Sequence, residues 1–146
     1  MLILQEQRCA MNEIVSVLDA ASKIIVYKDG KNVEYFKNDD NYGKIYTAWK
    51  MMVEDSHQMP AFGVSIDADT KKAMNEGVWV EFVFDEVKSC CEMPFSKILV
   101  NVCADFGGFN LIRYDRGGYN GRCFYLNLAE KNMSEFYRTV LELFED

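Results

Sequence analysis

The chain has little of what usually marks a catalytic or metal-binding protein. Its 146 residues include a single histidine, His57, and only two prolines, Pro60 and Pro94. Its five cysteines show none of the paired two-residue spacings by which thiolates hold a zinc ion. The sequence contains no phosphate-binding loop, dinucleotide fingerprint or nucleophile elbow. We therefore expect no metal and no cofactor, and the sequence favours a non-enzymatic protein.

Long apolar runs are also missing. No stretch approaches the roughly 18 apolar residues that a membrane span requires. The first residues lack the basic start, the apolar run and the small-residue cleavage site of a signal peptide. The cysteines are odd in number and Cys90 is next to Cys91, which indicates reduced thiols rather than a disulfide framework. These absences predict a cytoplasmic location and no membrane segment.

Positive charge is scarce as well. The net charge is −7 and the isoelectric point is near 4.8. Such a field repels polyanions, so broad nucleic-acid binding is not expected, whereas a basic protein partner is compatible with it. A hydrophobic share of 49% and an aromatic share of 14% suit a packed core. No linker or repeat divides the chain, so we expect one domain over 1–146, with residues 1–10 poorly ordered if Met11 is the true start.

Apolar periodicity predicts an α+β fold. Hairpins and meanders dominate and regular βαβ alternation is missing, which favours a mostly antiparallel sheet with helices packed on one side. Asp29-Gly30 predicts a two-residue turn that places Val26 opposite Val33. An acidic connection is expected over 85–96. Helices are expected near 6–22, 41–55, 69–76 and 132–145, a hairpin over 24–36, and strands near 61–66, 78–84, 97–104, 109–114 and 122–128.

The segment from Arg113 to Arg122 is the one candidate binding site. It holds Arg113, Arg116 and Arg122 against Asp115 alone, with Tyr119 among them. Guanidinium groups beside aromatic rings can bind phosphate, carboxylate or a base. The alternative is a glycine turn whose arginines lie on the solvent face. Two registers are open, because a loop over 115–118 pairs Tyr114 with Tyr119, whereas a turn at Asn120-Gly121 pairs Tyr119 with Arg122.

Other polar groups have a structural interpretation beside a functional one. His57 is either a general base or a loop residue after a helix. Asp67 and Asp69 either bind a cation or cap a helix. The Cys90-Cys91 pair is either a redox switch or two incidental thiols. In each case the structural interpretation is the more common one, so none of these groups identifies a function.

The leading hypothesis is a protein-binding or regulatory module that uses a sheet face or the 113–122 hairpin. The first alternative is a small-molecule enzyme or ligand-binding domain with an anion site at this hairpin, and Asp105 or His57 as the acid or base. The second alternative is RNA binding through the same hairpin. A homodimer is expected if an edge of the sheet is exposed, because an unpaired edge invites pairing.

Overall fold

The computed structural model describes residues 13–145 and contains one seven-stranded sheet. The strand order is β2-β1-β4-β5-β6-β7-β3, and every neighbouring pair is antiparallel. This confirms the predicted α+β class with an antiparallel sheet. The strands are β1 (Lys23–Lys28), β2 (Lys31–Phe36), β3 (His57–Ser65), β4 (Val78–Cys90), β5 (Met93–Val102), β6 (Gly108–Tyr114) and β7 (Gly121–Asn127). The helices are α2 (Glu13–Val17), α3 (Asp40–Val53), α4 (Asp67–Ala73) and α5 (Ser134–Glu145), with a 3-10 turn at Leu18–Ala20.

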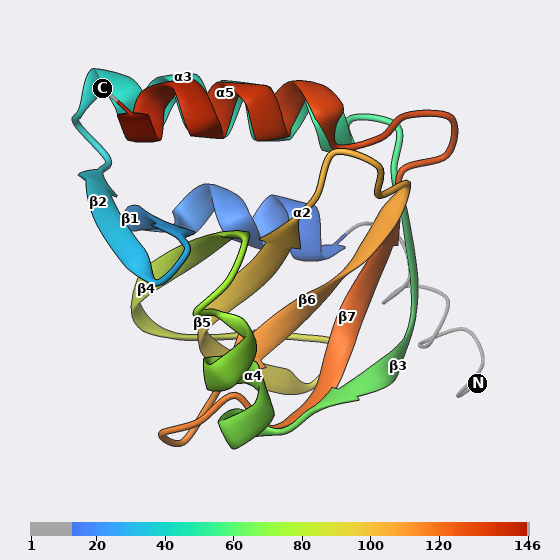
Figure 1. Cartoon of the computed structure of the whole chain (residues 1–146). Coiled ribbons are helices and arrows are strands. Elements are labelled where there is room, and N and C mark those ends of the chain that lie inside the picture. The colour runs from blue at the N-terminus through green and yellow to red at the C-terminus, as the bar shows by residue number, and fades with distance from the viewer. Residues whose placement is uncertain (1–12, 146) are drawn as a thin grey trace.

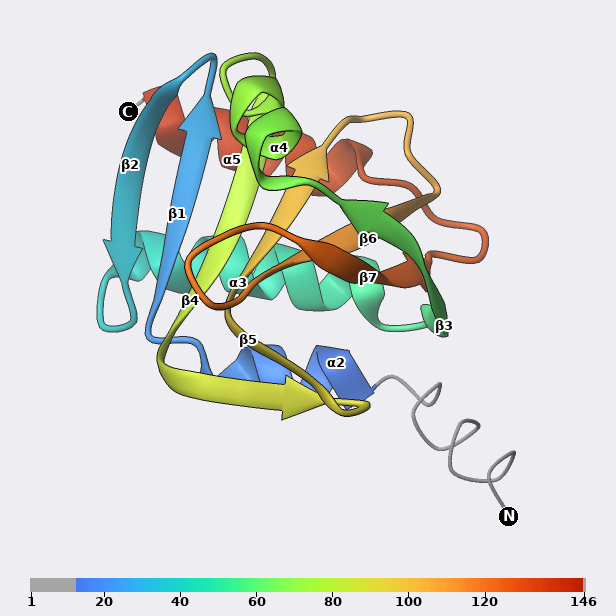
Figure 2. The same cartoon turned by 90° about the horizontal axis from the view of Figure 1, so that it is seen from below.

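The helices lie on both faces of this sheet. Strands β4 to β7 form a continuous meander, β1 joins it beside β4, and β3 joins it beside β7. Helix α3 carries the chain from the β2 edge to the β3 edge and lies against α5 on one face (Figure 1). The chain returns through α4 on the opposite face (Figure 2). The expectation that all helices pack on one side is therefore wrong for α4.

The main core lies between the sheet and the helices α2, α3 and α5. Alternate strand residues face it, because successive side chains of a strand point to opposite faces. Val80 and Phe82 of β4 are fully buried there. Trp49 of α3 is also fully buried, with its ring centroid 4.9 Å from that of Phe82 and 5.5 Å from that of Phe136 of α5. The apolar periodicity of the 41–55 segment thus predicted the buried face of α3 correctly.

The first hairpin has the predicted register. Val26 is opposite Val33, and Asp29 and Gly30 form the turn with φ of 50° and 86°. Only residues that tolerate positive φ fit such a turn without strain, which explains the Asp-Gly pair. Asp39 immediately precedes α3, and its carboxylate accepts the backbone N–H of Phe36 at 2.8 Å instead of capping the helix.

The acidic connection expected over 85–96 is wrong. Strand β4 continues to Cys90 and β5 starts at Met93, so these residues form a hairpin arm that bends away from the sheet beside α2 (Figure 2). The pairing changes register between Val83 and Lys88, where the arm bends. Segment 85–92 lacks apolar alternation and Gly or Pro turn signals, so its strand structure comes from tertiary pairing.

Other element ends differ by a few residues. Strand β3 begins at His57, four residues before the expected start at residue 61. Helix α4 begins at Asp67, two residues before the expected start at residue 69. The predicted helix 6–22 is observed from Glu13, with Ile14 and Leu18 buried, while its part before residue 13, including Met11, lies outside the described residues. Helix ends are the least certain part of a sequence-based prediction because capping and tertiary contacts decide them.

Candidate functional site

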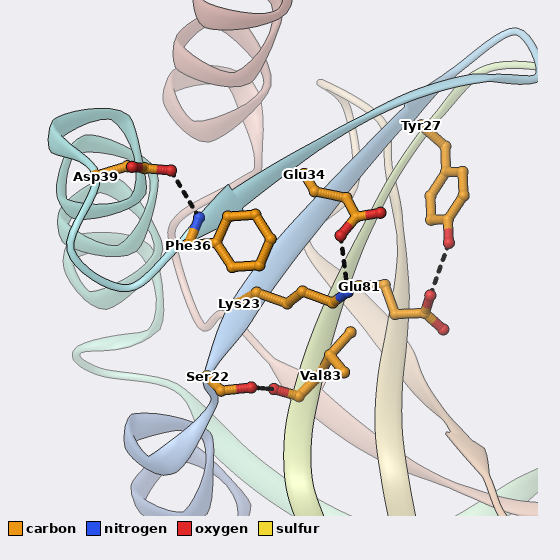
Figure 3. Close-up of polar contacts among 8 residues, drawn as sticks. All are labelled: Ser22, Lys23, Tyr27, Glu34, Phe36, Asp39, Glu81 and Val83. Atoms are coloured by element: carbon orange, nitrogen blue, oxygen red, sulfur yellow. Dashed lines mark hydrogen bonds and ion pairs between the residues drawn. The ribbon is translucent and has the colours of Figure 1, made fainter.

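The face of the sheet beneath α4 contains a buried carboxyl group. Glu81, in the first half of β4, has no exposed surface. The Tyr27 hydroxyl donates to its Oε1 at 2.8 Å, and the Tyr119 hydroxyl donates to its Oε2. Figure 3 shows the bond from Tyr27 to Glu81 across neighbouring strands. Each carboxyl oxygen therefore has a hydroxyl donor, which offsets the cost of taking this group out of water.

The two tyrosines are held in their protonated form. Burial raises the pKa of Tyr27 and of Tyr119 above the ordinary value of 10.0, and the neighbouring Glu81 raises both further. At neutral pH both hydroxyl groups therefore act as fixed hydrogen-bond donors. A general acid or base works best with a pKa near the working pH, so this cluster is suited to structure rather than to proton transfer.

The 113–122 hairpin adopts the first of the two registers. Asp115 and Gly118 form an isolated bridge, and the turn between them is made by Arg116 and Gly117, with φ of 50° and 85°. The rings of Tyr114 and Tyr119 then meet edge to face, with centroids 4.9 Å apart. This loop folds over the face beneath α4 and brings Tyr119 down onto Glu81.

The candidate arginines do not act together on one surface. Arg113 is buried and donates from Nε to the carbonyl of Arg122 and from Nη1 to the carbonyl of Pro94, each at 2.8 Å. Burial lowers the pKa of its guanidinium group. Arg116 is exposed at the turn, with its Nε 3.1 Å from a carboxylate oxygen of Asp115, and the side chain of Arg122 is exposed as well. Arg113 thus fastens β6 to the ends of β5 and β7.

The first residue of α4 forms hydrogen bonds with the same 113–122 hairpin. The Asp67 carboxylate accepts the backbone N–H of Tyr119 at 2.9 Å and lies 3.1 Å from the ammonium group of Lys71. The bond from Tyr119 is the main cause that lowers the pKa of Asp67, and Lys71 lowers it further. The backbone N–H of Asp67 donates in turn to Oδ1 of Asn120 at 2.9 Å. The carboxylate that the sequence offered as a cation ligand therefore holds the hairpin.

The uncovered part of this face carries two lysines that the sequence analysis did not single out. The ammonium group of Lys23 lies 2.7 Å from Oε1 of Glu34 and 5.6 Å from the ring centroid of Phe36. Figure 3 shows Lys23 between these two side chains of β2. Lys97 lies 4.5 Å from the ring centroid of Tyr114. Both ammonium groups thus have partners on the same face. Across five strands, the row of paired residues is Phe36, Lys23, Val83, Lys97 and Tyr114.

The tip of the β4–β5 arm brings together a second polar cluster. The Cys90 thiol donates to Oε2 of Glu13 at 3.1 Å, and the backbone N–H of Cys91 donates to the same oxygen at 3.3 Å. The two sulfur atoms are 3.7 Å apart. Gln58 of β3 places its Nε2 3.8 Å from the Cys91 sulfur. Burial, with the bond to Glu13, raises the pKa of Cys90, so this thiol is not an activated nucleophile.

Two open cavities lie elsewhere. One of about 500 Å³ lies where α4, β4, β5 and α5 meet, and Cys103 and Glu76 are among its lining residues. One of about 590 Å³ lies along α3. Neither is lined by Arg113, Arg116, Tyr119 or Arg122. His57 is exposed at the start of β3 and Asp105 is exposed after β5, and neither is among the lining residues of these cavities.

Comparison with protein-family models, curated proteins and solved structures finds no match to this chain. Within residues 13–145, no helix has both the length and the apolar character that crossing a membrane requires. The interpretation of the molecule therefore depends on its own geometry.

Proposed function

We propose that the chain is a non-enzymatic protein-binding module whose edge strand β3 pairs with an extended segment of a partner protein. The observation that supports this proposal most is that β3 lies at an edge of the sheet. Strand β3 is last in the sheet order and has one hydrogen-bonded neighbour, β7, among the described residues. An edge strand offers unpaired backbone groups to an incoming strand, and its side chains supply specificity.

The second half of β3 has the chemistry of a strand-pairing surface. Val64 is 72% exposed, and Ile66, directly after the strand, is 57% exposed. The first half is less accessible to pairing, because Pro60 lacks a backbone donor and the register with β7 changes between Met59 and Gly63. A partner strand would therefore pair along residues 63–66 and cover Val64 and Ile66.

Charge favours a different protein over a second copy of this chain. Each copy carries −7, so two copies repel each other, whereas a basic segment is attracted. Glu54 and Asp55 lie shortly before β3, and Asp67 and Asp69 follow it. We place this interaction in the cytoplasm, which the four free cysteines of the described chain support.

The anion-site and RNA alternatives have less support. Both need the arginines of the 113–122 hairpin to be available together. Arg113 is buried on two backbone carbonyls, and the exposed Arg116 is paired with Asp115, so the guanidinium groups do not form one cationic surface. Two exposed arginines in a chain of net charge −7 give a polyanion little to bind.

Site-specific photocrosslinking in the producing cells tests the proposal. A photoreactive residue at position 64 should give a discrete adduct with another protein, and Ile66→Lys in the same chain should abolish it by placing a charge on the pairing surface. The matched control carries the photoreactive residue at Met51, which is 64% exposed on α3. Equal adducts at both positions, or none at position 64, would contradict strand pairing by β3. An adduct of two copies would contradict a foreign partner.

A further inference from the structure

The β4–β5 arm makes its two adjacent cysteines converge. Successive side chains of a strand point to opposite faces, so neighbouring cysteines normally diverge. Here Cys90 ends β4, and Cys91 begins the turn with a φ of 53°, in the left-handed region. Glu92 follows with a φ of 67°. This turn redirects the Cys91 side chain, and the two sulfur atoms lie 3.7 Å apart as free thiols.

A carboxylate completes the cluster from another element. Glu13, the first residue of α2, places Oε2 3.1 Å from the Cys90 sulfur. One ligand atom from each of Glu13, Cys90 and Cys91 lies within 4.8 Å of the other two. The cluster thus joins α2 to the arm, two segments that lie side by side in Figure 2.

These separations match tetrahedral coordination. With a zinc–sulfur bond of about 2.3 Å, two thiolates of a tetrahedral site lie about 3.8 Å apart. With a zinc–oxygen bond of about 2.1 Å, a thiolate and a carboxylate oxygen lie about 3.6 Å apart. The observed sulfur–sulfur distance of 3.7 Å and the 3.1 Å from the Cys90 sulfur to the Glu13 oxygen are close to these values, and the Cys91 sulfur lies within 4.8 Å of a Glu13 oxygen. A metal ion would therefore require only a movement of Glu13.

Gln58 holds the cluster from the side. It is 5% exposed, and its Oε1 accepts the backbone N–H of Ile14 at 3.0 Å while its Nε2 approaches the Cys91 sulfur. An amide N–H directed at a thiolate is the type of neighbouring contact that orients metal ligands. Gln58 thus fixes both the start of α2 and the thiol of Cys91.

We propose that Cys90, Cys91 and Glu13 bind a thiophilic divalent cation, Zn²⁺, and leave its fourth coordination position to water. Two sulfur ligands select zinc over magnesium and calcium, which prefer oxygen. The carboxylate oxygen is a poor ligand for Cu⁺, which favours soft donors only. Two thiolates and a carboxylate carry −3 together, and Zn²⁺ reduces this to −1. The ion would tie α2 to the arm.

Cobalt titration of the untagged, reduced full-length chain tests this site. Co²⁺ should bind one ion per chain, with thiolate-to-cobalt charge-transfer absorption in the near ultraviolet and the visible bands of tetrahedral cobalt. Zn²⁺ should displace Co²⁺, and the charge-transfer and visible bands should then disappear. Cys90→Ser and Cys91→Ser should each weaken binding about 100-fold, and Glu13→Gln about 10-fold. The matched control Cys103→Ser removes a thiol that lines the 500 Å³ cavity and should leave the titration unchanged.

Three outcomes would overturn the proposal. The first is a titration without charge-transfer bands. The second is octahedral cobalt, which would indicate oxygen ligands. The third is binding that persists in the Cys90→Ser/Cys91→Ser double variant. Circular dichroism of each variant separates a lost ligand from a lost fold. Of the two cysteines, Cys91 is half-buried and Cys90 is buried, so Cys91→Ser is the variant that should disturb the fold less.

Discussion

Two glutamates of this chain each accept hydrogen bonds from two donors, yet their surroundings differ in kind. Glu81 is fully buried, and its donors are the hydroxyl groups of Tyr27 and Tyr119. Glu13 is exposed, and its donors are the Cys90 thiol and the backbone N–H of Cys91. Both join elements that are distant in sequence. The difference is whether a donor group can lose its proton.

The donors of Glu81 are locked, whereas one of the two donors of Glu13, the Cys90 thiol, is exchangeable. The raised pKa of Tyr27 and of Tyr119 keeps both protons in place at neutral pH. A thiol proton, although the pKa of Cys90 is raised too, can be displaced by a soft metal ion that binds the sulfur directly. We infer that Glu81 serves the fold alone, whereas Glu13 serves a site that can change its occupant.

Replacing Glu81 should have the largest effect on stability. Glu81→Ala leaves the buried hydroxyl of Tyr119 and the half-buried hydroxyl of Tyr27 without their acceptor, and we expect a loss of about 3 kcal/mol in the free energy of unfolding. Glu81→Gln keeps one carbonyl acceptor and should lose about half as much. Urea denaturation of the three proteins measures both values. Equal stability of the Ala and Gln variants would mean that the hydroxyl groups find other partners.

Removing one donor from Glu81 should have the next largest effect. Tyr119→Phe takes away a hydroxyl group that is buried, and should cost about 2 kcal/mol, because it leaves a buried carboxyl oxygen of Glu81 without its donor. Tyr27→Phe should cost about 1 kcal/mol, since Tyr27 is half-buried and water can replace its hydroxyl. Thermal and urea unfolding check the order. A larger cost for Tyr27→Phe would show that the hairpin is not the main support of Glu81.

Alkaline pH should weaken the Glu81 cluster. A tyrosine whose pKa is raised by folding gives stability that is fully present below the unfolded value of 10.0 and falls as pH rises above it. Between about pH 9.5 and about pH 10.5, the two tyrosines together should cost roughly 1.4 kcal/mol. The difference between the wild type and Tyr27→Phe/Tyr119→Phe isolates this effect from other tyrosines. Parallel pH profiles of the two proteins would contradict it.

Much of the fold could be predicted from local signals. The Asp29-Gly30 turn fixed the register of β1 and β2, and the apolar spacing of 41–55 predicted the buried face of α3. The arm at 85–95 could not be predicted in this way. Within the arm, the end of β4 pairs with the start of β5, and the arm lies beside α2. Its turn is made by Cys91 and Glu92, two residue types that seldom adopt positive φ.

The candidate sites were predicted less well, for a related reason. The sequence marked the 113–122 hairpin by composition, but composition does not reveal that Arg113 binds backbone carbonyls or that Tyr119 covers Glu81. The cysteine pair was visible, but Cys90 and Cys91 lack the two-residue spacing by which thiolates usually hold a zinc ion, so no metal was expected there. Glu13 is 77 residues from Cys90 in sequence, and only the folding of the arm onto α2 brings them together.

Replacing Glu13 should have the smallest effect on stability, and it tests directly whether the two glutamates differ in role. In metal-free protein, Glu13→Gln should change the free energy of unfolding by no more than about 0.5 kcal/mol, because the side chain is exposed and water can replace it. The same substitution at Glu81 provides the matched measurement. If Glu13→Gln costs as much as Glu81→Gln, both glutamates are structural supports and the distinction between locked and exchangeable donors fails. If it costs little without metal and much with Zn²⁺ present, the exposed glutamate contributes through the ion that it binds.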